Sequence, residues 1–257
     1  MKIVYAGDRD ISVRILDFII NEGVLPSALL VSDVIKASHA EELANRCRNV
    51  TGCRIMRGDQ FRQEEGVSLL REIEPDFLIC VHFPYIVPKE LLSIPVHGVL
   101  NLHPAYLPFN RGWHTPSWAI WDKTQYGATL HFMDEGLDTG DIVAQKGMSV
   151  RPDDTADKLY KRIFDLEYDL FKETWPLLMS GKYSRKPQAL NRGTEHKKSD
   201  LSAIQQINLD ERVGAGELIR RLKALTTNNV REAAYFTDNN IKYRIQINVQ
   251  KEEENQL

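Results

Sequence analysis

Three polar side chains in two separated segments are of the types that acyl transfer to an amine requires. Asn101 and His103 alternate with a leucine in the apolar run 99–103, and Asp138 stands between two glycines in the segment 136–140. Side chains two positions apart on a strand share one face, so Asn101 and His103 would point the same way. A carboxylate in a glycine-flanked loop can reach a histidine, orient its ring and stabilise its charged form.

The functional groups of these residues indicate one kind of chemistry. An amide such as Asn101 can donate to an oxyanion that develops on an attacked carbonyl. A histidine can take up the proton that an attacking amine loses. The absence of a serine or cysteine beside the three residues favours an external nucleophile. A purely structural interpretation, in which a buried asparagine and histidine are simply hydrogen-bonded, explains the Asn101–His103 pair alone equally well.

The elements that must position these residues follow from the apolar pattern. Apolar runs alternate with helical periodicities, which predicts a mainly parallel sheet covered on both faces. Pro104 ends the strand that carries His103, so both polar side chains lie where open α/β sheets bind their ligands. We expect strands at 2–7, 28–31, 53–57, 75–81 and 99–103, with helices that end near residue 21 and span 40–49 and 60–73.

The rest of the chain divides into two parts. The pattern predicts a helix at 115–122, strands at 127–133 and 141–150, and a helix at 154–175 that Pro176 kinks or ends. After Lys182 the sequence becomes polar, and we place a domain boundary there, with a catalytic domain at 1–182 and a small α+β lobe at 183–257. The lobe would contain a helix at 215–225 and two strands within 233–249, joined at the Asp238-Asn-Asn240 turn.

Composition narrows the class of protein. The chain has 257 residues, 42% of them hydrophobic, and a net charge of −3, which gives no broad attraction to nucleic acid. Three cysteines without C-x-x-C spacing indicate free thiols in a reducing compartment. The sequence has no apolar run of membrane-spanning length and no signal peptide at its start. We therefore expect a cytoplasmic protein with no membrane partner.

The spacing of the glycines and histidines argues against a dinucleotide cofactor and against a bound zinc ion. The turn after the first strand, Gly7-Asp-Arg-Asp10, has one glycine where the dinucleotide fingerprint needs three. His97, His103 and His131 lack the short helical spacing of a zinc motif, so we predict no metal.

The two central segments together carry a family resemblance. The motifs Asn101-Leu-His-Pro, Leu107-Pro, Asn110-Arg-Gly, Gly127-Ala-Thr-Leu-His and Leu137-Asp-Thr-Gly-Asp-Ile142 occur in this order. They resemble the N10-formyltetrahydrofolate-dependent formyltransferases, and the resemblance runs through most of residues 1–180. It implies a Rossmann-like formyltransferase fold, N10-formyltetrahydrofolate as co-substrate, and Asn101, His103 and Asp138 as the catalytic residues.

The resemblance also implies where the substrates bind. The loop after the fourth strand and the loop that carries Asp138 would form the folate pocket, although packing on the core explains the apolar residues of the first loop equally well. The expected folate-binding residues are Phe83, Tyr85, Ile86, Val87, Asp134, Gly136 and Asp141. The expected residues for the second substrate are Tyr106, Phe109, Asn110, Arg111, Trp113, Lys197 and Lys198, of which the two lysines could equally be solvated surface.

Within the family, the segment His103-Pro-Ala-Tyr-Leu-Pro-Phe-Asn-Arg-Gly-Trp-His114 is most similar to the sugar N-formyltransferases. This resemblance implies formylation of a dTDP-linked 3- or 4-amino-dideoxy sugar for surface polysaccharide (O-antigen, lipopolysaccharide) synthesis, and a homodimer. Two alternatives stay open: a formyltransferase that acts on another small-molecule amine, and a non-catalytic module that binds folate or a nucleotide.

Overall fold

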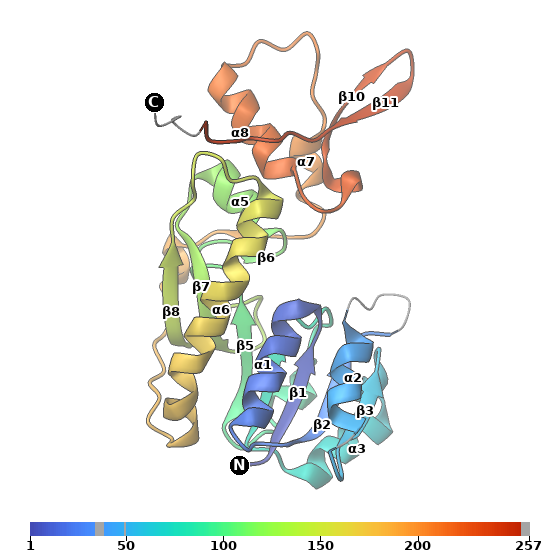
Figure 1. Ribbon diagram of the computed structural model, residues 1–257, viewed down its shortest axis with the longest axis vertical. Coiled ribbons are helices and arrows are strands. Elements are labelled where there is room, and N and C mark those ends of the chain that lie inside the picture. The colour runs from blue at the N-terminus through green and yellow to red at the C-terminus, as the bar shows by residue number, and fades with distance from the viewer. Residues whose placement is uncertain (34–38, 49, 253–257) are drawn as a thin grey trace. The chain divides into compact units, whose positions relative to one another are not determined.

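A computed structural model describes residues 1–33, 39–48 and 50–252 (Figure 1). Its main feature is a seven-stranded sheet with the order β3-β2-β1-β4-β5-β7-β8. The predicted α/β class and mainly parallel sheet are confirmed. The strands of this sheet are β1 (Ile3–Gly7), β2 (Pro26–Val31), β3 (Arg54–Arg57), β4 (Phe77–Val81), β5 (Gly98–His103), β7 (Tyr126–Phe132) and β8 (Ile142–Met148).

The strand order places β1 and β4 side by side at the centre, where the crossover direction reverses. Neighbouring strands from β3 to β5 are parallel, and β7 runs antiparallel to β5. β1 and β4 are buried along their whole length, as their continuous apolar sequences require for a sheet covered on both faces. The helices of this part are α1 (Arg9–Asn21), α2 (Ala40–Arg48), α3 (Glu64–Ile73), α4 (Lys89–Leu92) and α6 (Ala156–Met179).

Two hydrophobic layers hold the helices on the sheet. On one face Val4, Leu78 and Val99 pack in a cluster with Phe61 and Leu70 from the segment around α3. Elsewhere Phe18 of α1 meets Phe171 and Trp175 of α6 edge-to-face, with ring centroids 6.3 Å apart in both cases. The first cluster packs the segment around α3 on the strands, and the aromatic contacts pack α1 against α6.

Two helical predictions need correction. The helix expected at 60–73 is a 3-10 turn, η1 (Gln60–Arg62), followed by α3, because Gln63 adopts an extended backbone with ψ 160°. Gly66 then packs so closely that an added Cβ would lie 2.3 Å from the Gln60 carbonyl oxygen. The last position of the helix expected at 40–49 lies outside the described residues. Pro176 does not end α6, which continues to Met179.

The described chain divides into two compact units, one formed by 1–103, 128–146 and 164–189, the other by 104–127, 147–163 and 190–257. In the second unit, Trp118, Leu201, Leu225 and Ala234 form a hydrophobic cluster. The domain boundary near Lys182 stays a proposal. The elements of the second unit are β6 (Arg111–Gly112), α5 (Thr115–Asp122), η2 (Leu190–Arg192), β9 (Glu195–His196), α7 (Ser202–Gln205), α8 (Ala215–Leu225), η3 (Val230–Glu232), β10 (Ala234–Asp238) and β11 (Ile241–Ile245).

The C-terminal hairpin forms around the turn that the sequence predicts. Asn239 and Asn240 have φ values of 46° and 63°, and positive φ at both central residues is the signature of a two-residue type I′ turn. The second strand ends at Ile245, short of the expected 249. Among the helices in the described ranges, none combines the length and the hydropathy of a transmembrane span.

Candidate active site

The candidate site begins at the carboxyl end of β5. In the antiparallel pairing of β5 with β7, Asn101 lies opposite His131 and His103 lies opposite Thr129. On the other side of β5, Asn101 lies beside Cys80 of β4. Paired residues on neighbouring strands share a face. The polar side chains therefore lie together on one face of the sheet, near the carboxyl end of β5.

Burial makes Cys80 of β4, which lies beside Asn101, an unsuitable nucleophile. It raises the pKa of the Cys80 thiol to about 12, so the group stays protonated at neutral pH. This agrees with the expectation that the attacking group comes from outside the protein.

The loop between β7 and β8 brings Asp138 to the strand end. Asp138 itself has a left-handed φ of 53°. A Cβ at Gly140 would lie 2.1 Å from the Phe132 carbonyl oxygen, so only glycine permits this close return of the loop. Gln188, which follows α6, donates from Nε2 to the carbonyl oxygens of Asp138 (2.9 Å) and Gly140 (2.7 Å). The role of Gln188 was not predictable from sequence, because no local motif connects this residue to a loop fifty positions earlier.

The structure brings the three predicted catalytic residues together within the first unit. The carboxylate of Asp138 has Oδ2 at 3.5 Å from His103 Nε2 and Oδ1 at 3.4 Å from Asn101 Nδ2. The side chains of His103 and Asp138 are only 9% and 11% exposed. Electrostatic interactions at this degree of burial are stronger than at the surface.

His131 is a fourth member of the cluster. Its Nδ1 lies 2.7 Å from the Phe132 carbonyl oxygen, and a carbonyl only accepts, so Nδ1 carries a proton. Its Nε2 lies 3.3 Å from Asn101 Nδ2 and 3.5 Å from Asp138 Oδ1. In the neutral tautomer Nε2 therefore accepts from the Asn101 amide. From sequence, His131 was considered only as a metal ligand or a strand residue, although its place in the motif Gly127-Ala-Thr-Leu-His could have indicated a role in the site.

The hydrogen bonds of the Asn101 amide are long enough that a substrate atom could replace one of them. Its Nδ2 contacts His131 at 3.3 Å and Asp138 at 3.4 Å, both longer than the usual N–H···O or N–H···N distance. A substrate oxygen at the strand end can replace one of these long contacts at little cost, since catalytic hydrogen bonds often shorten only in the complex.

The predicted folate residues on the loop after β4 differ in exposure. Val87 is 5% exposed and belongs to the core, so its side chain is not available to a ligand, whereas Ile86 is 77% exposed. Phe83 and Tyr85 pack around Phe61, with ring centroids 5.4 and 6.1 Å away. Residues 83–87 therefore form a loop anchored by its aromatic rings, with Ile86 facing outward.

The predicted folate residues near Asp138 hold the loop itself. Asp134 accepts hydrogen bonds from Gly136 N (3.0 Å) and Thr139 Oγ1 (2.5 Å), which closes the turn. Asp141 Oδ2 accepts from Arg185 Nε at 3.1 Å. These contacts shape the segment that presents Asp138.

The predicted acceptor residues lie in the second unit. Asn110 is fully buried, and its side chain forms hydrogen bonds with Thr124 and Thr194. Arg111 pairs with Glu195 at 3.4 Å. Trp113 is 41% exposed with the Lys198 ammonium 5.1 Å from its ring, and Lys197 is exposed. Tyr106 and Phe109 are half-buried.

Comparison with protein families gives two matches. The family described as formyl transferase matches residues 26–174. A second family, described as the N-formyltransferase dimerization C-terminal domain, matches residues 200–251.

Two relatives with assigned functions illustrate the similarity. A methionyl-tRNA formyltransferase of Geotalea daltonii is 39% identical over 138 residues, which are 53% of this chain and 44% of that protein. A dTDP-4-amino-4,6-dideoxyglucose formyltransferase of Mycobacterium bovis is 32% identical over 165 residues, which are 63% of this chain and 68% of that protein. The chain spans about half the length of the methionyl-tRNA formyltransferases that it matches.

Solved structures share the fold over nearly the whole chain. A sugar N-formyltransferase from a Shewanella species has a TM-score of 0.83 and 24% identity, covering 98% of this chain and 99% of that one. A 4-N formyltransferase from Francisella tularensis has a TM-score of 0.82 and 25% identity, covering 97% and 98%. An N-formyltransferase from Helicobacter canadensis, in complex with folinic acid and dTDP-3-aminofucose, has a TM-score of 0.67 and 20% identity, covering 93% and 85%.

Proposed function

Because the chain belongs to the formyl transferase family, we propose that it is an enzyme that transfers a formyl group from N10-formyltetrahydrofolate to the amine of a nucleotide-linked amino sugar. The observation that carries this proposal is the convergence of Asn101, His103 and Asp138 at the end of β5. Asp138 lies within 3.5 Å of both other residues. This arrangement supplies a hydrogen-bond donor, a base and a carboxylate to one reacting centre.

Each residue has one task in the proposed reaction. Asn101 Nδ2 donates to the formyl oxygen as negative charge develops there during attack by the amine. His103 takes up the proton that the amine loses and returns it to N10 of tetrahydrofolate as the bond between N10 and the formyl carbon breaks. Asp138, 3.5 Å from His103 Nε2, orients the imidazole and stabilises its protonated form. The folate supplies an activated formyl group when bound.

The loop after β4 fits the folate. The carboxyl edge of the sheet is where open α/β sheets place ligands, and this loop begins there, beside the strand that carries Asn101. Phe83 and Tyr85 anchor the loop, and the exposed Ile86 offers an apolar surface for a flat ring. We therefore keep Phe83, Tyr85 and Ile86 as folate-loop residues, whereas Val87 supports the loop from the core.

The second substrate is defined here by its nucleotide and by the position of its amine. We propose a dTDP-linked 3- or 4-amino-dideoxy sugar, supported by the function of the Mycobacterium bovis relative and by the ligand in the Helicobacter canadensis structure. Synthesis of a surface polysaccharide such as an O-antigen is the corresponding role. A net charge of −3 argues against tRNA as acceptor, since the phosphates of nucleic acid attract cationic surfaces.

The match of residues 200–251 supports a homodimer, which would form through the C-terminal segment. Three free cysteines support a cytoplasmic location, because thiols stay reduced there.

A product assay tests the proposed function. The protein is incubated with N10-formyltetrahydrofolate and a panel of dTDP-amino sugars that carry the amine at C3 or at C4, and products are analysed by mass spectrometry. We expect one acceptor to gain the mass of a formyl group in place of a hydrogen. Formylation of an unrelated small amine, with none of the sugars modified, would move the activity to a different substrate class. Absence of any turnover, with folate binding retained, would favour a binding module.

A further inference from the structure

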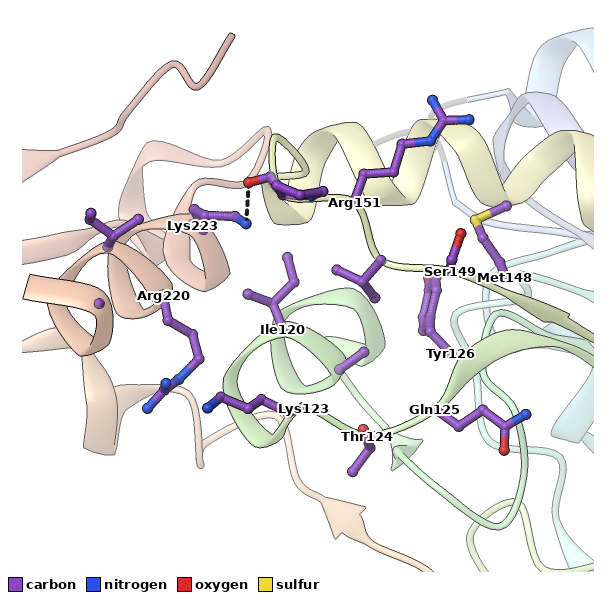
Figure 2. A pocket seen from close by; sticks show the side chains of 15 residues that line it. Ile120, Lys123, Thr124, Gln125, Tyr126, Met148, Ser149, Arg151, Arg220 and Lys223 are labelled. Atoms are coloured by element: carbon purple, nitrogen blue, oxygen red, sulfur yellow. Dashed lines mark hydrogen bonds between the residues drawn. The ribbon is translucent and has the colours of Figure 1, made fainter. Parts of the chain in front are cut away.

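A cavity separate from the candidate active site lies wholly within the second unit. It is formed by α5, the segment between β8 and α6, and α8 (Figure 2). Its volume is about 750 Å³, within the range of small-molecule sites. Apolar side chains such as Ile120, Met148 and Ile219 form its walls. The cavity thus has room and apolar area for an organic ligand.

The charged residues of the cavity have one sign. Lys123, Arg151, Arg220 and Lys223 line it, and none of the described lining residues is an aspartate or glutamate. This contrasts with the negative net charge of the whole chain. Figure 2 shows Lys123, which follows the last residue of α5, and Arg220 of α8 reaching into the space between the two helices, whereas Arg151 turns away along α6.

In the part of the chain that the structure describes, Lys123, Arg220 and Lys223 form no ion pair with a carboxylate. Lys223 Nζ donates to the neutral carbonyl oxygen of Pro152 at 2.6 Å. Burial lowers the pKa of the Lys223 ammonium, against the opposing effect of Asp154 and Asp153. The Arg220 guanidinium lies 5.2 Å from the Trp121 ring, and its Nε is buried without a hydrogen-bond partner in the described part of the chain. A buried donor without an acceptor costs free energy that an anion would recover.

We propose that this cavity binds a phosphate-bearing organic ligand, with Lys123, Arg220 and Lys223 holding the phosphate groups. Guanidinium and ammonium groups recognise phosphate through charge-assisted hydrogen bonds. The apolar walls accept the organic part. The ligand is either the nucleotide diphosphate of the acceptor proposed above or a separate phosphorylated metabolite, and the two share this recognition chemistry.

Calorimetric titration of the whole protein with dTDP and with inorganic pyrophosphate tests the assignment. The variant is Lys123→Gln together with Arg220→Gln, which removes two exposed or half-buried cations without emptying the core. The matched control is Arg71→Gln together with Lys182→Gln, which removes the same charge from exposed positions of the first unit. We expect the first double variant to bind dTDP at least about tenfold more weakly than the control, with a smaller salt dependence.

The outcomes separate the two sources of the phosphate. A rise in the KM for the dTDP-amino sugar alongside the lost dTDP affinity assigns the cavity to the acceptor. Lost dTDP affinity with unchanged formyl-transfer kinetics assigns the cavity to a separate ligand. This binding result does not depend on the roles proposed for Asn101, His103 and Asp138. Equal dTDP and pyrophosphate affinities in both double variants overturn the proposal. So does a loss of dimer in the Lys123/Arg220 variant with phosphate affinity intact, since the cavity would then belong to a protein interface.

Discussion

His82 Nε2 lies 2.9 Å from each carboxylate oxygen of Glu167, and the Glu167 side chain is completely buried. His82 directly follows β4 and has a left-handed φ of 51°, whereas Glu167 lies in α6. A buried carboxylate needs such a partner because desolvation without pairing is costly. The pair thus ties the start of the 83–87 loop to a helix that packs on the sheet.

Removing one member of this pair is expected to be costly for stability. Glu167→Leu or His82→Leu alone should lower the free energy of unfolding by about 3–5 kcal/mol, since each leaves a buried polar group without its partner. The double substitution should cost less than the sum of the two, because no polar group is left buried without its partner. Urea unfolding of the four proteins measures this. Additive losses would mean that the two side chains do not interact energetically.

The close return of the Asp138 loop is expected to make Gly140 essential for activity. Gly140→Ala places a Cβ 2.1 Å from the Phe132 carbonyl oxygen, so the backbone must shift and carry Asp138 with it. A displacement of about 1 Å at a reacting group costs on the order of 100-fold in rate. Steady-state kinetics check this. Gly214→Ala is the control, because an added Cβ there meets nothing within 4 Å. Equal kcat values in the two variants would contradict the role given to the loop.

Stability is expected to fall in mild acid because of two histidines in the second unit. Burial lowers the pKa of His114 and of His196, and in each case a nearby carboxylate, Glu232 or Asp122, opposes this. Below the unperturbed histidine pKa of about 6.5, these histidines bind protons in the unfolded chain but remain largely neutral in the folded chain. The free energy of unfolding should therefore decrease as the pH falls through about 6.5 and on toward the lower folded values.

Denaturant unfolding at a series of pH values measures this slope. His196→Asn should make the slope shallower, because one of the two histidines no longer contributes. His196 stacks on Trp118 at a centroid distance of 3.9 Å, so some stability is lost at every pH. An unchanged slope in the variant would show that His196 does not contribute to the acid sensitivity.

Much of the fold follows from local sequence. The strands β1 and β4 are continuous apolar runs, and α5 begins and ends where the pattern around Thr115 and Asp122 predicts. The Asn239–Asn240 turn was predictable because asparagine tolerates positive φ. The break at Gln63 was not, since nothing in the periodicity of 60–73 distinguishes an extended residue from a helical one.

The candidate site was predictable where its residues lie in motifs. Asn101, His103 and Asp138 were found from strand alternation and glycine spacing, and the structure places them together. Gln188 and Glu167 were not found, because each acts across a distance in sequence that only the folded chain closes. The burial of Val87 and Asn110 was not predictable for the same reason, since burial of a loop residue depends on its tertiary neighbours.

The central claim is that His103 is the base, supported by Asp138 and assisted by Asn101. The most direct measurement is the single-turnover rate of formyl transfer to the accepted sugar in the wild-type protein and in His103→Ala, Asp138→Ala and Asn101→Ala, with folate binding and thermal unfolding measured on each. We predict a rate at least about 100-fold lower in each variant, the scale of one lost general base or oxyanion donor, with folding retained. A His103→Ala protein that binds folate and transfers the formyl group at nearly the wild-type rate would contradict the account.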